Sequence, residues 1–94
     1  MAGPADSAPL PAPAPQVLVA SLGAETVLLD LAGKRYHQLN ASATVIWQAL
    51  EAGGDRASAT RALTEAFDVA ADVAAGAVDA LLGELAAHHL VAAR

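Results

Sequence analysis

Apolar and polar residues follow a period of two in three short runs between residues 17 and 39. The runs span residues 17–22 (VLVASL), 25–31 (ETVLLDL) and 34–39 (KRYHQL), and each link between them contains a glycine. A period of two is typical of strands with one buried face, and short glycine-containing links are typical of hairpins. The pattern therefore predicts a three-stranded antiparallel meander, with Gly33 free to adopt a positive φ in the second turn.

The third predicted strand, residues 34–39, differs from the other two in its position. Its alternation puts Arg35, His37 and Leu39 on one face, and Lys34, Tyr36 and Gln38 on the other. Because it is the last strand of the meander, one of its edges has no partner. Such an edge can accept another strand.

After residue 39 the apolar spacing becomes helical. Asn40 is a preferred N-cap residue, and a stripe of Ala43, Ile46, Trp47 and Leu50 follows at i, i+3, i+4 and i+7. The pair of glycines at 53 and 54 is expected to end this helix.

Two further helices are predicted, over residues 57–67 and 73–88. Asp55 or Ser58 is expected to cap the first, and Asp72 the second. The inward stripe of the last helix consists of Ala74, Val78, Leu81, Leu82 and Leu85. Beyond it, Leu90 and Val91 are expected to pack under the sheet. The order βββααα predicts a small α+β domain similar to a winged helix-turn-helix.

The N-terminal segment has a different composition. All five prolines lie within the first 15 residues, where they alternate with alanine. Such a sequence favours extended polyproline II and lacks many backbone donors. We therefore expect residues 1–15 to be a disordered tail and residues 16–94 to form the only domain.

Composition indicates in which compartment of the cell the protein acts. The chain has no cysteine, which excludes disulfides and thiolate chemistry. It has no apolar run approaching the roughly 20 residues that span a bilayer, and its start lacks the basic and apolar regions of a signal peptide. We expect a cytoplasmic protein with no membrane partner.

Charge argues against a nucleic-acid partner. The formal net charge is −5, from ten acidic and five basic residues, whereas nucleic-acid binders present a cationic surface. The last predicted helix carries Asp72, Asp79 and Glu84 but no Lys or Arg, so it would repel a phosphate backbone. A winged-helix transcription regulator remains the alternative that the element order suggests.

The sequence contains no convincing catalytic or metal-binding motif. His37 stands alone on a strand, and His88 and His89 are neighbours that diverge on a helix, so they do not form an i, i+4 metal pair. The acidic residues are scattered, and neither a dinucleotide fingerprint nor a phosphate loop is present. We expect a protein that is not an enzyme and uses no metal or cofactor.

The remaining class of function is that of an interaction module, a domain that binds a partner. An open strand edge beside an acidic, partly apolar helix is suited to an extended peptide, with main-chain hydrogen bonds giving affinity and side-chain pockets giving selectivity. The simpler alternative is that the hairpin only completes the core. We expect that alternative to hold for Leu29, Leu31 and Leu39.

The stretch VLLDLAGKRYHQLNASATVIWQALEAGG, residues 27–54, resembles the PqqD family of peptide chaperones. The shared features are a hydrophobic strand, a Gly-basic turn, an aromatic strand ending in Leu-Asn, and an apolar helix ending near Gly-Gly. The later segments ATRALTEAFDV and VDALLGELAAHHLV are similar to the family's next two helices. The resemblance covers about residues 17–91.

The resemblance implies a function without catalysis. Family members bind the leader segment of a ribosomally synthesised precursor peptide as an added antiparallel strand, and present the precursor to modifying enzymes. This chain is most similar to the stand-alone members of lasso-peptide pathways, whose partners are a leader peptidase and a cyclase. The alternative within the family is a partner of a radical S-adenosylmethionine enzyme in quinone cofactor biosynthesis. A scaffolding or inhibitory subunit is a further alternative, and the open edge allows a monomer or a weak homodimer.

Carried onto this sequence, the resemblance predicts a leader-binding site with two walls. The strand wall consists of Lys34, Arg35, Tyr36, His37, Gln38 and Leu39, and the helix wall of Asp72, Ala75, Gly76, Asp79, Leu82 and Gly83. Asp72 and Asp79 are expected to attract a basic leader residue. Gly76 and Gly83 each weaken a helix by about 1 kcal/mol relative to alanine. Either a strand backbone approaches them closely, or they are tolerated on a solvent face.

Overall fold

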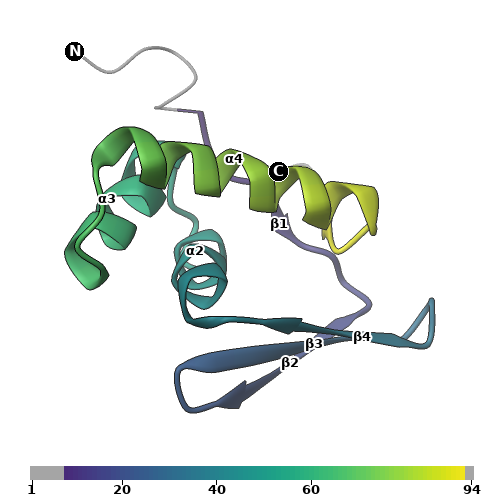
Figure 1. Ribbon diagram of the computed structural model, residues 1–94. Coiled ribbons are helices and arrows are strands. Elements are labelled where there is room, and N and C mark those ends of the chain that lie inside the picture. Colours follow the sequence, from purple (N-terminus) through teal and green to yellow (C-terminus); the bar gives the residue numbers. More distant parts are fainter. Residues whose placement is uncertain (1–7, 93–94) are drawn as a thin grey trace.

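The computed structural model describes residues 8–92 of the 94-residue chain. In chain order the elements are β1 (Ala12–Pro13), β2 (Val17–Leu22), β3 (Glu25–Asp30), β4 (Arg35–Leu39), α2 (Ala41–Glu51), α3 (Arg56–Ala66), α4 (Ala71–Ala87) and β5 (Val91–Ala92). Strands β2, β3 and β4 form an antiparallel sheet in that order, and the helices lie on one side of it (Figure 1). The α+β class and the succession of three strands and three helices are confirmed.

The sheet register assigns each residue to a face. Strand β3 pairs with β4 from Thr26↔Leu39 to Asp30↔Arg35, and residues directly opposite each other share a face. The face toward the helices carries buried Leu39, whereas Tyr36, on the other face, is 72% exposed. The alternation predicted for the third strand is therefore confirmed.

The turn between β3 and β4 is organised by Asp30. Its Oδ1 accepts hydrogen bonds from the amides of Ala32 and Gly33, each at 3.2 Å. The positive φ of this turn, 55°, belongs to Lys34, so the expectation of a positive φ at Gly33 was wrong. A Cβ at Gly33 would lie 2.6 Å from Oδ2 of Asp30, so a larger residue there would force the Asp30 side chain to shift.

The first two helix caps follow the sequence closely. The side chain of Asn40 accepts the amide of Ala43 at 2.9 Å, and Gly53 follows the helix with a φ of 78°. At the start of α3, Asp55 and Ser58 act together in a capping box, since each side chain bonds the other residue's amide.

The start of α4 corrects the sequence prediction. Its N-cap is Ala70, which makes no side-chain cap bond, and Asp72 lies inside the first turn. The carboxylate of Asp72 accepts the amide of Val73 at 3.0 Å. Asp72 is therefore not the cap, although a negative charge in the first turn still interacts favourably with the helix dipole.

The end of α4 is a Schellman motif built on a residue other than glycine. The amide of Leu90 donates to the carbonyl of Leu85 at 2.9 Å, and that of His89 to Ala86 at 3.1 Å. His89 itself adopts a left-handed φ of 58°. Leu85 and Leu90 are both buried, so the motif returns the chain into the core.

The N-terminal segment belongs to the folded unit. Strand β1 pairs with β5 through Ala12↔Ala92 and Pro13↔Val91, and Leu10 is buried with its amide donating to the Gly54 carbonyl at 3.0 Å. The expectation of a solvated tail is therefore wrong for residues 10–14, because their apolar side chains close the core. Residues 1–7 of that predicted tail lie outside the described residues.

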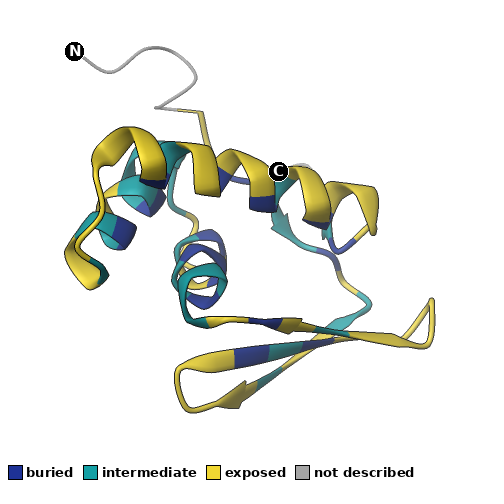
Figure 2. Ribbon diagram, viewed as in Figure 1, coloured by how far each residue is buried: buried dark blue, intermediate teal, exposed yellow. Residues whose placement is uncertain are grey.

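Buried positions lie on the strands and on all three helices (Figure 2), and their apolar side chains form one core cluster. Its largest fully buried members are Trp47, Leu10, Leu28, Ile46, Leu50, Leu85, Leu90 and Val78. Of the predicted core residues, Leu39 is buried, but Leu29 and Leu31 are exposed on the outer face of the sheet. Leu90 is buried in the core, and Val91, which begins β5, is half-buried and packs against it. Across residues 8–92, no helix is both long and apolar enough to cross a membrane.

Candidate functional site

The outer edge of β4 is open, since no strand among residues 8–92 pairs with it. The amide of Leu31 donates to the carbonyl of Gln16, one step beyond the Val17↔Asp30 pair. Hydrogen-bonded pairs alternate in an antiparallel ladder, so Thr26, Leu28 and Asp30 direct their backbone groups toward β4. The residues opposite them on β4 direct their own backbone groups toward β3. The N–H and C=O groups of Tyr36 and Gln38 therefore lie on the open edge.

A groove of about 160 Å³ separates β4 from α4. Its lining consists of His37, Gln38 and Leu39 from the strand, Leu81, Glu84 and Leu85 from the helix, and His88 and Leu90 from the residues that follow the helix. The leucines Leu39, Leu81, Leu85 and Leu90 are buried, so the groove has an apolar floor. Polar side chains form its rim.

At one end the groove continues into a polar hollow of about 250 Å³. The imidazole rings of His37 and His88 meet there, with centroids 5.0 Å apart. The hollow is lined by Asp30, Gly33, Arg35, His37, Ala87, His88 and His89. In the part of the chain that the structure describes, no three His, Cys, Asp or Glu residues are placed to hold a metal ion.

The strand residues predicted from the sequence are divided between the two faces of β4. Arg35, His37 and Leu39 face the groove and the hollow, and Gln38 contributes to the groove rim. Lys34 and Tyr36 line an apolar depression on the outer face, together with Leu29 and Leu31, and Arg35 and Asp30 border this depression as well as the hollow. The structure thus places Arg35, His37 and Leu39 on the α4 side of β4, and the outward backbone groups of Tyr36 and Gln38 along the open edge.

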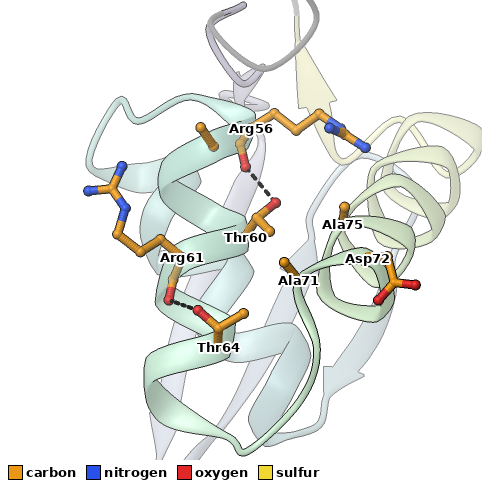
Figure 3. Close-up of a pocket in the computed structure, with 8 residues that line it drawn as sticks. Arg56, Thr60, Arg61, Thr64, Ala71, Asp72 and Ala75 are labelled. Atoms are coloured by element: carbon orange, nitrogen blue, oxygen red, sulfur yellow. Dashed lines mark hydrogen bonds between the residues drawn. The ribbon is translucent and has the colours of Figure 1, made fainter. Parts of the chain in front are cut away.

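The helix residues predicted from the sequence do not line this groove. Asp72 and Ala75 border a different hollow of about 450 Å³ between α3 and α4 (Figure 3). Leu82 packs, half-buried, against the core. Gly76 and Gly83 face open space, with nothing within 4 Å of the place that a Cβ would occupy. The prediction that these residues form one wall opposite β4 was wrong, because that face of α4 turns toward α3 and solvent.

Asp79 has a partner within the domain. Arg56 of α3 donates from Nε to Oδ1 and from Nη2 to Oδ2, each at 2.8 Å. The hydrogen bonds from Arg56 hold the pKa of the Asp79 carboxyl below its ordinary value of 3.8. The carboxylate is therefore used to join two helices, and it lies away from the groove beside β4.

Sequence reasoning missed part of the groove wall. It assigned Leu81 and Leu85 only to the core, and it did not place Glu84 or His88 in the leader-binding site. These two residues follow Leu81 at i+3 and i+7, so they extend along a stripe beside the buried one. A search for a second stripe next to the core stripe would have found the groove-facing side of α4.

Similarity to known proteins agrees with this geometry. Residues 25–91 match the model of the family described as coenzyme PQQ synthesis protein D (PqqD). Among solved structures, the chain is similar to TbiB1 in complex with the TbiA(beta) leader peptide, with a TM-score of 0.80 and 26% identity over 85% of this chain and 93% of that one. None of the curated proteins compared with the chain matches it.

A second solved structure has the same architecture. It is a lasso peptide synthetase B1 complexed with the leader peptide, and it superimposes with a TM-score of 0.72 and 32% identity over 79% of this chain and 87% of that one. The family model covers most of the chain, including the sheet strands β3 and β4 and all three helices. The resemblance noted in the sequence is confirmed, and the chain belongs to the PqqD family.

Proposed function

We propose that this chain is a peptide chaperone that binds the leader segment of a ribosomally synthesised precursor peptide. The leader adds to β4 as an antiparallel strand and lies in the groove between β4 and α4. The observation that carries the proposal is the open β4 edge bordering an apolar-floored groove, in a fold shared with two proteins solved with leader peptides.

The backbone of β4 supplies the affinity in this proposal. The N–H and C=O groups of Tyr36 and Gln38 face outward and match the hydrogen-bonding period of an added strand. These groups are the same whatever side chain the residue carries. Most side-chain substitutions on β4 are therefore expected to have mild effects on binding.

The groove supplies the selectivity. Alternate side chains of an added strand point to the same face, so every second leader residue enters the space between β4 and α4. Leu39, Leu81 and Leu85 offer that face an apolar surface. We infer that the leader carries at least one apolar residue that packs on these leucines.

The chemistry of the pathway belongs to partner enzymes in this proposal. The chain presents the bound precursor to a leader peptidase and a cyclase of the lasso type, which is supported by the lasso peptide synthetase B1 neighbour. Delivery to a radical S-adenosylmethionine enzyme is the alternative that the family description supports. The chaperone acts in the cytoplasm, as a monomer or a weak homodimer through the same β4 edge.

The test is a titration of the ¹⁵N-labelled full-length chain with a synthetic leader peptide from the precursor gene beside its own gene. We expect an affinity of about micromolar or tighter and NMR shifts concentrated in residues 34–39 and 81–90. A scrambled peptide of the same composition is the control. Shifts concentrated between α3 and α4, around Arg61 and Asp72, would contradict the proposed placement.

A further inference from the structure

Four basic side chains gather where the groove meets the β3–β4 turn. Arg35 and His37 come from β4, and His88 and His89 from the end of α4, and all four line the same hollow. Within residues 8–92 none of these side chains forms an ion pair or a side-chain hydrogen bond. Their N–H groups are therefore available to a ligand.

The backbone at His89 is held in a conformation that disfavours a side chain. Its φ of 58° lies in the left-handed region, where glycine is relaxed and other residues are strained. This position nevertheless carries an imidazole that contributes to the hollow's lining. The Schellman motif at the end of α4 accounts for this conformation, and it places His89 beside the hollow.

One acidic side chain lines the hollow and a second lies nearby. Asp30 lines it, but this carboxylate is largely buried, and its Oδ1 already accepts two amides of the turn. Glu84 lines the groove on the leucine side and does not line the hollow. A guanidinium and three imidazoles around one small space suit a carboxylate, which accepts charge-assisted hydrogen bonds from both kinds of donor.

We propose that this hollow binds the carboxylate of an Asp or Glu side chain of the leader peptide, an inference that rests on the proposed function. In an added strand, the residues opposite Leu39, His37 and Arg35 point into the groove at intervals of two. They form the closely spaced pairs of the new ladder, because Tyr36 and Gln38 make its hydrogen bonds. The leader therefore carries an acidic residue two or four positions from the apolar residue that packs on the leucine floor.

The test uses display of short random peptides selected on the full-length protein, so that the sequence of the natural leader is not needed. The wild type is expected to enrich peptides with Asp or Glu two or four positions from an aliphatic or aromatic residue. A variant with Arg35→Gln, His37→Gln and His88→Gln is expected to keep the apolar preference and lose the acidic one. Arg61→Gln, which removes a positive charge from exposed α3 surface, is the matched control and is expected to select like the wild type.

A second measurement needs no change in the protein. Replacing the acidic residue of a selected peptide by its amide is expected to weaken binding to the wild type by about fivefold, and to leave binding to the triple variant unchanged. Selected peptides without an acidic preference would overturn the carboxylate site and leave strand addition standing. A selection that enriches no peptide would overturn strand addition itself, and the carboxylate site with it.

Discussion

Arg56 of α3 donates two hydrogen bonds of 2.8 Å to the carboxylate of Asp79 on α4. The side of α4 that carries Asp79 faces α3. The stripe of Leu81, Glu84 and His88 is then left to face β4. The orientation of one helix therefore decides which residues are available to a peptide on the open strand edge.

Replacing Asp79 by Asn is expected to lower the free energy of unfolding slightly at neutral pH and to leave it unchanged at acid pH. The pKa of Asp79 is depressed in the folded state, so its stabilisation is present above its ordinary pKa and is lost as pH falls through the folded value. Because Asp79 is 56% exposed, we expect a loss of roughly 0.5 kcal/mol at neutral pH. Urea denaturation at neutral pH and at about pH 2.5 measures the difference. An equal deficit at both pH values would exclude the ion pair as its cause.

The Asp79→Asn variant also tests whether Asp79 belongs to the leader-binding site. Leader affinity is expected to be unchanged in Asp79→Asn, because the carboxylate lies between α3 and α4 and away from the groove. A tenfold loss of affinity would instead restore Asp79 to the binding site. Isothermal titration with the leader peptide distinguishes these results.

Proline at Gln38 is expected to abolish leader binding with a small effect on folding. The substitution removes an outward N–H from the open edge and leaves the ladder between β3 and β4 intact. Ser21→Pro is the matched control, because the amide of Ser21 faces outward from β2 at the opposite edge of the sheet. Circular dichroism checks the fold of both variants, and peptide titration measures binding. Equal affinity in the two variants would argue against strand addition on β4.

Leu10→Ala is expected to destabilise the domain by about 2–4 kcal/mol, since it opens a cavity at a side chain that is 2% exposed. The control is Leu18→Ala, at a leucine that is 53% exposed on the sheet. We expect that variant to change the free energy of unfolding by less than about 0.5 kcal/mol. Similar losses in the two variants would show that the N-terminal segment does not pack as described.

Gly76→Ala and Gly83→Ala are each expected to raise the free energy of unfolding by about 0.5–1 kcal/mol. Nothing lies within 4 Å of a Cβ at either position, and neither glycine has a positive φ. Leader binding should be unaffected, because both positions face solvent. Weaker binding in either alanine variant would indicate that a peptide backbone approaches α4 there, as the sequence had allowed.

His89→Gly separates stability from selectivity. It is expected to stabilise the fold by up to about 1 kcal/mol, because glycine relaxes at the left-handed φ of 58°. Removing the imidazole is also expected to weaken the preference for acidic peptides, measured by display selection. Thermal denaturation gives the stability change, and a lower melting temperature would show that the imidazole, not the backbone, dominates at this position.

Local sequence was sufficient for the elements and most of their ends. Asn40, Asp55 and Ser58 cap the helices at which they were expected, because a cap depends on atoms within three residues along the chain. The alternation in β4 was likewise determined by its own residues. One local expectation was wrong: the positive φ of the turn belongs to Lys34 and not to Gly33.

The sequence by itself determined the order of strands and helices, the buried stripes, the open edge and the family resemblance, since periodicity and caps act over short distances. Only the tertiary structure decided that Leu10 belongs to the core. It also decided that Leu81, Glu84 and His88 of the α4 region face β4, and that the rings of His37 and His88 lie in contact. These relationships depend on the rotation of one helix about its axis and on contacts between residues far apart in the chain. Burial of the stripe of Ala74, Val78, Leu81 and Leu85 in the core sets that rotation.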